Sequence, residues 1–332
     1  MRHRIILLLL LIGSITTLLV APLLGSERIP WAAVWQPAPD DPSSVIFWSI
    51  RLPRACLAWI SGAGLAMGGM IFQAIFRNPL AEPFTLGISS GAALGATLAM
   101  RLGLGLSFLG FSGAALGGMG GALAAIGIVY ALTRLRPGLT TSTMLLAGVA
   151  VNFFFSSLIL MVQHTANFYD SFRILRWMMG GLQMVGFDAS LHILPVTLAV
   201  AGIAWWLTSE LNLLTLGDEW AVSRGVAATR VKTILFFSVS LMVGAIVSLC
   251  GPIGFIGLMC PHICRLLVGP NHRRLLPASL LFGGAFLVAC DTVARTAMAP
   301  AELPVGIFTS FLGGPFFIWL LLRPSREGEM IG

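Results

Sequence analysis

Ten long apolar runs dominate the sequence and restrict the folds that the chain can adopt. Most approach the length of about 20 residues that an α-helix needs to cross the hydrocarbon core of a bilayer. They lie at about residues 5–24, 54–75, 84–101, 108–132, 141–163, 191–209, 231–250, 254–267, 276–294 and 306–322. The eighth run is short and is preceded by Gly251-Pro252, so we expect a broken or partly buried helix there. The pattern predicts about ten transmembrane helices.

The composition also indicates an integral membrane protein. Hydrophobic residues make up 57% of the 332 residues and charged residues only 10%, whereas soluble chains average about 25% charged residues. The runs are too long for the alternating strands of an outer-membrane barrel, which have about ten residues each. The net charge of +7 does not indicate nucleic-acid binding, because the arginines lie at the ends of apolar runs. We therefore expect an all-α integral membrane protein with a single transmembrane domain over residues 1–332, and a first run retained as a helix.

The distribution of basic residues predicts the orientation of the chain. If the N-terminus is cytoplasmic, thirteen basic residues fall on the inside and seven on the outside. This distribution obeys the positive-inside rule. With ten spans, both termini are then cytoplasmic, and so is the polar segment Leu211–Lys232. The seven outer residues are Arg28, Arg51, Arg54, Arg101, Arg173, Arg176 and Arg295.

The segment Leu211–Lys232 is a polar stretch between two long apolar runs. It predicts two short helices joined at Gly217, neither long enough to cross a bilayer. Thr215 and Asp218 have the spacing of a capping box, which predicts that the second helix begins at Thr215. We expect Arg224 in its last turn and Gly225 just after its end. Such a segment is either a docking surface for another protein or an ordinary solvated loop.

Catalytic signatures are absent from the sequence. It contains no H-E-x-x-H, no G-x-S-x-G and no P-loop, so any energy from ATP must come from another subunit. Asp291 is the one acid well inside a late run, and Arg295, four residues on, is its expected partner. So few buried acids give little support to an ion-coupled secondary carrier. We expect Cys260 and Cys264 to be small buried hydrophobes, with no metal or cofactor bound.

Four polar motifs interrupt the apolar runs. Arg51–Arg54 (RLPR) lies at the predicted outer mouth of the second span, and Arg77–Pro83 (RNPLAEP) forms a predicted inner turn. The third motif joins GPIGFIG to PHICR across residues 251–265, and the fourth is Glu302–Gly306 (ELPVG), before the last run. Each motif alone is typical of interfacial arginines and of prolines that shape turns.

Taken together and in this order, the motifs resemble a known family. The stretches RLPR, IFQAIFRNPLAEPFTLGISSGAALGA, TMLLAGVAVN, LNLLTLGDEWAVSRGV, GPIGFIGLMCPHICRLLVG and ELPVGIFTSFLGGPFFIWLLL are similar to the permease subunits of type II ATP-binding-cassette importers. This family takes up iron–siderophores, haem and cobalamin. The resemblance extends from about Arg51 to Arg323.

The resemblance implies a ten-helix permease fold and a set of partners. Family permeases pair as dimers in the cell inner membrane, with two ATPase subunits beneath them and a periplasmic binding protein above. The family's cytoplasmic coupling helices match residues 211–226, which favours the docking surface over the solvated loop. The expected contacts to the ATPase are Leu214, Leu216, Asp218, Glu219, Trp220, Val222 and Arg224.

The resemblance also implies two further sets of site residues. Binding-protein glutamates pair with permease arginines in the family, and the matching positions are Arg51, Arg54 and Arg295. A planar guanidinium can hold a carboxylate with two hydrogen bonds, which suits this task. Cytoplasmic gating in relatives involves the turn between spans two and three and the start of span five. Those positions are Asn78, Leu80, Thr141 and Ser142.

The cargo stays open at this stage. The resemblance favours an iron chelate such as an iron–siderophore, with cobalamin or haem as the alternative for the same machine. Cargo choice in such systems rests mainly with the binding protein. Residues 164–188, with His164, Tyr169, Arg173 and Arg176, contact either the cargo or the binding protein. An ion-coupled secondary transporter or a membrane enzyme is a remote alternative.

Overall fold

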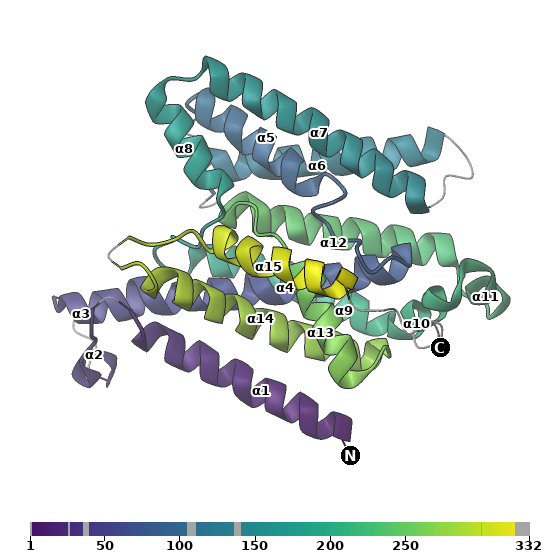
Figure 1. Cartoon of the computed structure of the whole chain (residues 1–332), viewed down its shortest axis with the longest axis horizontal. Coiled ribbons are helices and arrows are strands. Elements are labelled where there is room, and N and C mark those ends of the chain that lie inside the picture. The colour runs from purple at the N-terminus through teal and green to yellow at the C-terminus, as the bar shows by residue number, and fades with distance from the viewer. Residues whose placement is uncertain are drawn as a thin grey trace.

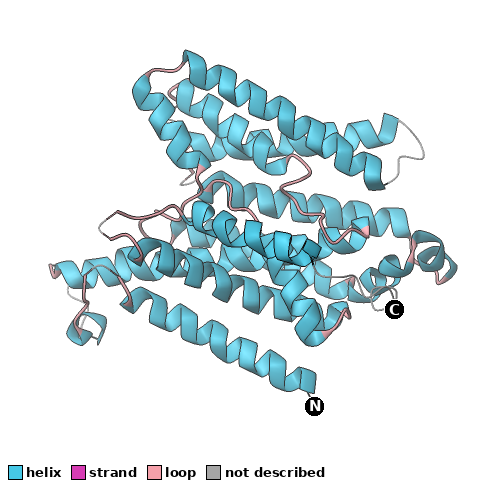
Figure 2. Ribbon diagram, in the orientation of Figure 1, coloured by secondary structure: helices cyan, strands magenta, loops and turns pink. Residues whose placement is uncertain are grey.

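The computed structural model describes residues 2–25, 27–35, 40–104, 111–135, 141–299 and 301–322. Every regular element in these ranges is helical (Figure 2). Each of the ten predicted runs corresponds to a helix, which confirms the predicted all-helical fold class. These helices are α1 (Arg2–Val20), α4 (Leu52–Phe76), α5 (Ile88–Arg101), α6 (Gly113–Leu135), α7 (Thr141–Thr165), α9 (Asp188–Trp206), α12 (Ala228–Cys250), α13 (Ile256–Val268), α14 (His272–Thr296) and α15 (Val305–Leu322).

Shorter elements lie at the two ends of the helix bundle. Figure 1 shows α2, α3 and α8 at one end and α10 and α11 at the opposite end, where α1 begins and α15 ends. We call these the α8 end and the α11 end. The short elements are η1 (Ala21–Leu23), α2 (Trp31–Trp35), α3 (Pro42–Val45), η2 (Ile46–Arg51), α8 (Phe168–Met178), α10 (Thr208–Leu216) and α11 (Asp218–Ser223).

The helices differ in their ability to cross a bilayer alone. Seven helical segments in the described ranges are long and apolar enough to do so. Helix α5 has 14 residues and α13 has 13, so they need protein neighbours on several sides. Helix α13 follows a non-helical stretch in which Phe255 has a φ of 69°, and it contains Pro261. The predicted irregular eighth segment is therefore confirmed.

The second span begins earlier than predicted. Helix continues without interruption from Pro42 to Phe76, so the RLPR motif lies inside it rather than at its mouth. Element η2 is a π-helix, and the N–H of Leu52 donates to the carbonyl of Phe47, five residues back. Pro53 comes two residues after this π-helix, where the regular series of helical hydrogen bonds is already interrupted. The proline is therefore accommodated without ending the helix.

Helix α4 is the centre of the bundle. It is buried along almost its whole length and contacts α14, α13, α12 and α9 (Figure 1). Glycines bring its backbone against two of these neighbours. A Cβ at Gly69 would collide with the carbonyl of Gly257 in α13, and one at Gly62 would collide with the carbonyl of Gly283 in α14. Because helices in lipid gain little from apolar burial against each other, such close backbone contact is a main source of their association.

A second close contact joins α5 and α6, both of which carry glycines spaced four residues apart. A Cβ at Gly91 would lie 2.5 Å from the carbonyl oxygen of Gly121, and one at Gly95 would collide with the carbonyl of Gly117. These two helices, with α7 and α8, lie together on one side of α12 (Figure 1). Helix α1 lies at the other edge against α14, and Trp59 of α4 donates to the hydroxyl of Ser14 at 2.7 Å.

The polar segment contains two helices joined at Gly217, as predicted, but their bounds differ. Helix α10 begins at Thr208 and ends at Leu216, so the prediction of a helix start at Thr215 is wrong. The Thr215 hydroxyl instead donates to the carbonyl of Asn212 within α10. Gly217 has a φ of 133°, in the region that favours glycine, and it ends one helix and begins the next. Helix α11 ends at Ser223, so Arg224 caps the helix instead of lying in its last turn, and Gly225 follows with a φ of 83°.

Alanine substitutions at two neighbouring glycines of α6 test the close packing against α5. Gly121→Ala places a methyl group against the backbone of Gly91, whereas nothing lies within 4 Å of a Cβ at Gly120. We expect Gly121→Ala to destabilise the protein by about 1–3 kcal/mol, as overpacking does. Gly120→Ala should be neutral or slightly stabilising, since alanine is the better helix former. Unfolding in detergent micelles measures both, and equal stability of the two variants would contradict the packing account.

Candidate functional site

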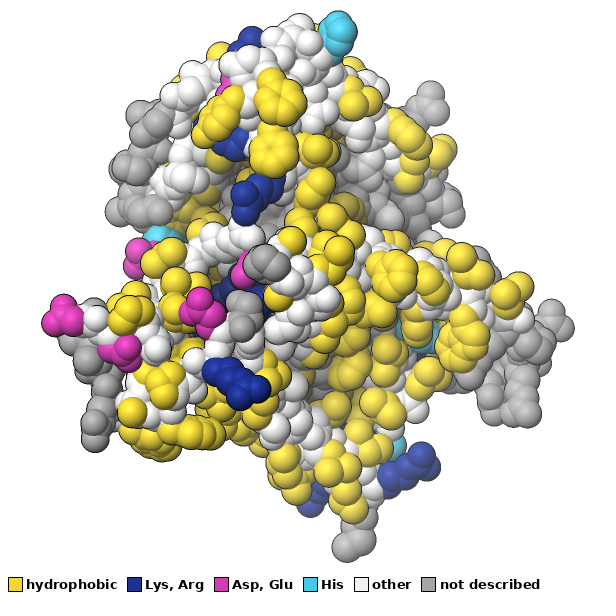
Figure 3. All heavy atoms as spheres, turned by 60° about the vertical axis from the view of Figure 1, so that its left-hand side comes forward, with side chains coloured by type: hydrophobic (Ala, Val, Ile, Leu, Met, Phe, Trp, Pro, Cys, Tyr) yellow, Lys and Arg dark blue, Asp and Glu magenta, His cyan; other side chains and the backbone are white. Residues whose placement is uncertain are grey.

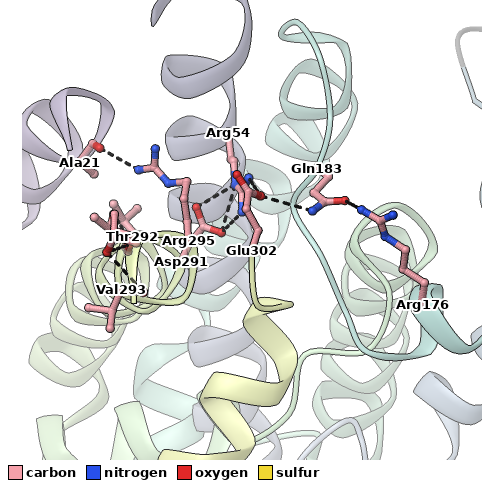
Figure 4. A network of polar contacts seen from close by, with 11 residues as sticks. Ala21, Arg54, Arg176, Gln183, Asp291, Thr292, Val293, Arg295 and Glu302 are labelled. Atoms are coloured by element: carbon pink, nitrogen blue, oxygen red, sulfur yellow. Dashed lines mark hydrogen bonds and ion pairs between the residues drawn. The ribbon is translucent and has the colours of Figure 1, made fainter. Parts of the chain in front are cut away.

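A network of polar side chains lies at the α8 end of the bundle. Arg54 of α4 donates through Nε and Nη2 to the carboxylate of Asp291 in α14, with Nη2–Oδ1 at 2.8 Å. Its Nη1 donates to Glu302 Oε2, also at 2.8 Å. Figure 4 shows the Arg54 side chain between the two carboxylates. Arg54 therefore joins α4, α14 and the loop before α15.

The network continues from Glu302 toward α8. Gln183 Nε2 donates to Glu302 Oε2 at 3.3 Å, and Arg176 Nη2 donates to Gln183 Oε1 at 2.7 Å (Figure 4). Arg176 is on α8 and is exposed. Figure 3 views this end of the molecule, where acidic and basic side chains gather beside a broad apolar surface. The chain of contacts thus leads from a buried arginine to the protein surface.

The expected pairing of Asp291 with Arg295 is wrong. Arg295 Nη2 donates to the carbonyl of Ala21 at 2.8 Å, and Asp291 pairs with Arg54 (Figure 4). The spacing of four residues places Asp291 and Arg295 on neighbouring turns, but α4 brings a guanidinium directly to the carboxylate. The start of η1 offers Arg295 a backbone carbonyl instead. Nε and Nη1 of Arg295 have no hydrogen-bond partner in the part of the chain that the structure describes.

The three predicted docking arginines lie close together and are all buried. Arg51 donates to the carbonyls of Pro22 at 3.4 Å and of Glu27 at 2.9 Å, so it holds the segment after α1. Arg295 binds the same segment at Ala21. Of these three arginines, only Arg54 has direct carboxylate partners among the ion pairs of the described residues. Arg51 and Arg295 therefore hold the segment after α1 through its backbone, whereas Arg54 holds the carboxylates of Asp291 and Glu302.

Glu302 is the exposed acid of this cluster. Its side chain is 38% exposed, against 4% for Asp291. Partial burial alone would raise the pKa of Glu302, but the hydrogen bond from Arg54 and the charge of that guanidinium outweigh burial and lower it. Glu302 is therefore ionised at neutral pH, and it covers the outward side of Arg54.

Helices α10 and α11 project from the α11 end of the bundle and expose both apolar and charged side chains. We call these two helices the handle. Leu216, Trp220 and Val222 are exposed apolar residues, and Trp220 is 62% exposed. Glu219 and Arg224 are also exposed. Leu214 is fully buried, so it holds α10 on the bundle and does not face outward. Of the residues predicted to contact an ATPase, those that form the exposed surface are Leu216, Glu219, Trp220, Val222 and Arg224.

Two polar contacts fix the handle to the bundle, and the sequence analysis missed both. Lys232 Nζ lies 2.7 Å from both carboxylate oxygens of Asp218, which ties α11 to α12. Asn212 Oδ1 accepts from the backbone N–H of His272 at 2.9 Å and lies 2.8 Å from His272 Nδ1, which ties α10 to the start of α14. The lone lysine of the chain was a usable signal for the first contact. No local signal marks the second, because 60 residues separate its partners.

The predicted inner turn between α4 and α5 lies next to the handle. Arg77 has a left-handed φ of 49°, and its Nη1 would lie 3.6 Å from a Cβ at Gly217. Asn78 Oδ1 accepts from the N–H of Leu80 at 2.9 Å, which holds the turn, and Leu80 is exposed. Thr141 and Ser142 lie in the first turn of α7, but their side chains are outside the described residues. Helix α7 reaches this loop through Asn152, which donates to the carbonyl of Phe84 at 3.0 Å.

Glu82, in the same loop, is a buried acid that the sequence analysis did not single out. It lies beside Gly257, where Gln73 Nε2 donates to the Gly257 carbonyl at 3.3 Å. Arg265 donates to the other end of Gln73 at 2.9 Å, and no ion pair to Glu82 occurs among the described residues. Burial without a cation raises the pKa of Glu82 to about 8. The sequence around Glu82 does not indicate this burial, because the burial depends on packing against α13, which is distant in the sequence.

Breaking the buried pair at Asp291 should destabilise the protein strongly. Asp291→Asn leaves the Arg54 guanidinium buried with one carboxylate fewer, and losing one partner of a buried pair typically costs about 3–5 kcal/mol. Asp170→Asn is the control, since it breaks the more exposed pair of Arg101 and Asp170, which are 3.5 Å apart. The control should lose about 0–1 kcal/mol. Similar losses in both variants, measured by unfolding in micelles, would contradict the role given to Asp291.

Glu82 predicts a pH dependence of stability. The folded pKa of about 8 lies above the ordinary value of 4.5. Between these values the folded state holds a proton that the unfolded state releases, so stability falls as pH rises through this window. Relative to Glu82→Gln, the natural chain should lose melting temperature steadily from about pH 5 to about pH 8. A difference between the two proteins that stays constant over this range would show that Glu82 titrates normally.

Comparisons with known proteins agree with this architecture. The model of the FecCD transport family matches residues 8–323. The hemin transport system permease protein HmuU of Yersinia pestis is 37% identical over 324 residues, which covers 96% of this chain and 97% of HmuU. The vitamin B12 import system permease protein BtuC of Klebsiella pneumoniae is 39% identical, covering 95% of this chain and 92% of BtuC.

A solved structure has the same fold. It is described as an inward-facing conformation of a metal-chelate type ABC transporter, and it superposes with a TM-score of 0.84 at 30% identity. The match covers 96% of this chain and 99% of that one. The family match over almost the whole sequence and the structural match are consistent with each other. The chain therefore belongs to the FecCD transport family, whose members are permease subunits of ATP-binding-cassette importers.

Proposed function

We propose that this chain is the membrane-spanning subunit of an importer that moves an iron chelate, such as an iron–siderophore, into the cytoplasm. It receives the chelate from a periplasmic binding protein and is driven by two separate ATPase subunits. A second copy of the chain completes the pathway as a homodimer in the cell inner membrane. The chain itself carries no ATPase activity in this proposal. Both termini are cytoplasmic, on the side of α10 and α11.

The observation that carries this proposal is the handle. Its exposed apolar residues, Leu216, Trp220 and Val222, lie on short helices that two polar contacts fix to the bundle. Large exposed apolar side chains in a polar segment are typical of a protein-binding surface. Asp218 and Asn212 tie the handle to α12 and α14. A force that an ATPase exerts on the handle would therefore be transmitted to the bundle instead of bending a loop. These properties suit a surface on which an ATPase acts.

The other site residues take their proposed roles from the two ends of the bundle. Arg51, Arg54 and Arg295 form the docking region for the binding protein at the α8 end. Asn78, Leu80, Thr141 and Ser142 form the cytoplasmic gate. The short distance between the Arg77 side chain and Gly217 supports the gate, because it places the inner turn beside the handle. Movement of the ATPase subunits would then reach the gate through a short path.

The cargo is the part of the proposal with alternatives. The printed names of the relatives refer to hemin and to vitamin B12, and the solved structure is described as a metal-chelate type transporter. Haem or cobalamin is therefore the runner-up for the same machine. Binding of an iron–siderophore, haem and cobalamin to the co-expressed binding protein, measured by calorimetry, separates them. Tight binding of cobalamin or haem alone would overturn the iron–siderophore assignment and leave the importer proposal in place.

Removing one exposed side chain of the handle should weaken ATPase binding. Trp220→Ala deletes a large apolar anchor, so we expect at least about a thirtyfold loss of affinity, the scale of an interface hot spot. Trp35→Ala is the matched control, because Trp35 is also exposed but lies on α2, at the α8 end. Affinity is measured between the permease in nanodiscs and its ATPase subunit. Equal affinity of the Trp220→Ala variant and the control would remove the handle from the proposal.

A further inference from the structure

The two carboxylates that Arg54 binds cover its guanidinium group. All three of its guanidinium nitrogens already donate to a carboxylate, and its side chain is only 7% exposed. A docking protein therefore cannot reach Arg54 unless one of the two acids moves. The two acids differ in how firmly they are held, and this difference shows which one leaves.

Asp291 is held firmly and Glu302 is not. Asp291 is buried on a helix and accepts three hydrogen bonds from Arg54. Glu302 accepts one bond from Arg54 and a longer one, 3.3 Å, from Gln183. It also lies in a non-helical loop, residues 301–304, and its side chain is partly in water. Glu302 is already partly in water, so it can move into solvent without opening the protein interior. Asp291 is buried, so moving it would open the interior.

We infer that Glu302 occupies, in the free permease, the position on Arg54 that a carboxylate of the docking protein takes on association. Docking is then an exchange of one carboxylate for another at Arg54 Nη1. The exchange keeps the buried guanidinium paired with two acids throughout, which avoids an unpaired buried charge. This inference deepens the proposed function, since it rests on a binding protein that docks at the α8 end.

The exchange also connects docking to the last helix. Glu302 lies three residues before the first residue of α15, and two backbone hydrogen bonds hold this loop and the first turn of α15. Leu303 N–H donates to the carbonyl of Ala294 at 3.1 Å, and Gly306 N–H donates to that of Gly180 at 3.4 Å. When Glu302 leaves Arg54, this loop loses its side-chain anchor to α4. Docking would therefore loosen the start of α15 relative to α4.

The test measures the affinity of the substrate-binding protein for the complete permease–ATPase complex in nanodiscs. Glu302→Gln removes the competing carboxylate and keeps the side-chain shape, so affinity should rise at least threefold. Asp40→Asn is the control, because it removes one exposed negative charge at the same end without touching Arg54. A weaker complex with Glu302→Gln, or an equal gain in both variants, would overturn the inference.

A second background isolates the role of Arg54. The double variant Arg54→Gln with Asp291→Asn removes the buried pair together, so neither charge is left unpaired. If Glu302 acts by competing for Arg54, adding Glu302→Gln to this background should leave affinity unchanged. A gain as large as in the natural background would refute the inference. Size-exclusion profiles and melting temperatures confirm that each variant is folded.

The same measurements separate this inference from the proposed function. If the double variant weakens docking but Glu302→Gln changes nothing, the exchange is refuted and docking at Arg54 stands. If the double variant docks as tightly as the natural chain, Arg54 is not part of the docking site, and the proposed exchange of carboxylates is refuted as well.

Discussion

The pairing of Arg54 with Asp291 is the interaction on which the α8 end depends. Separating this buried pair would leave two unpaired charges, and an unpaired buried charge is costly. This requirement fixes α4 against α14 at one point of each helix. Glycine contacts at Gly62 and Gly69 then set how closely α4 lies to its neighbours. Charge pairing thus fixes where α4 lies along α14, and glycines set the distance between α4 and its neighbouring helices.

Helix α14 connects the two ends of the molecule. Its first residue, His272, binds Asn212 of the handle, and its last turns carry Asp291 and Arg295 at the α8 end. A helix packed on several sides transmits displacement better than a loop, because dense packing leaves few voids to absorb it. The two functional ends that we propose are therefore mechanically joined by one element. The inner turn at Arg77 also lies beside the handle, next to Gly217, where α10 and α11 meet.

Much of this architecture is predictable from the sequence, because lipid imposes simple rules. Ten apolar runs predict ten helices, and Gly217 predicts the junction between α10 and α11. The errors arise where a short spacing in the sequence is taken to predict a contact between the two residues. Arg295 is four residues from Asp291, yet the acid pairs with Arg54, 237 residues away. Thr215 and Asp218 have the spacing of a capping box, but α10 runs through Thr215 because its buried Leu211 and Leu214 hold it on the bundle.

The central claim is that a separate ATPase drives transport through this chain. The most direct test is uptake of the cargo into proteoliposomes that contain the permease with its ATPase and binding protein, compared with vesicles that contain the permease alone. We expect uptake only in the complete system with ATP, and none under an imposed proton or sodium gradient without the ATPase. Uptake by the permease alone under such a gradient would contradict the account and identify the chain as a secondary carrier.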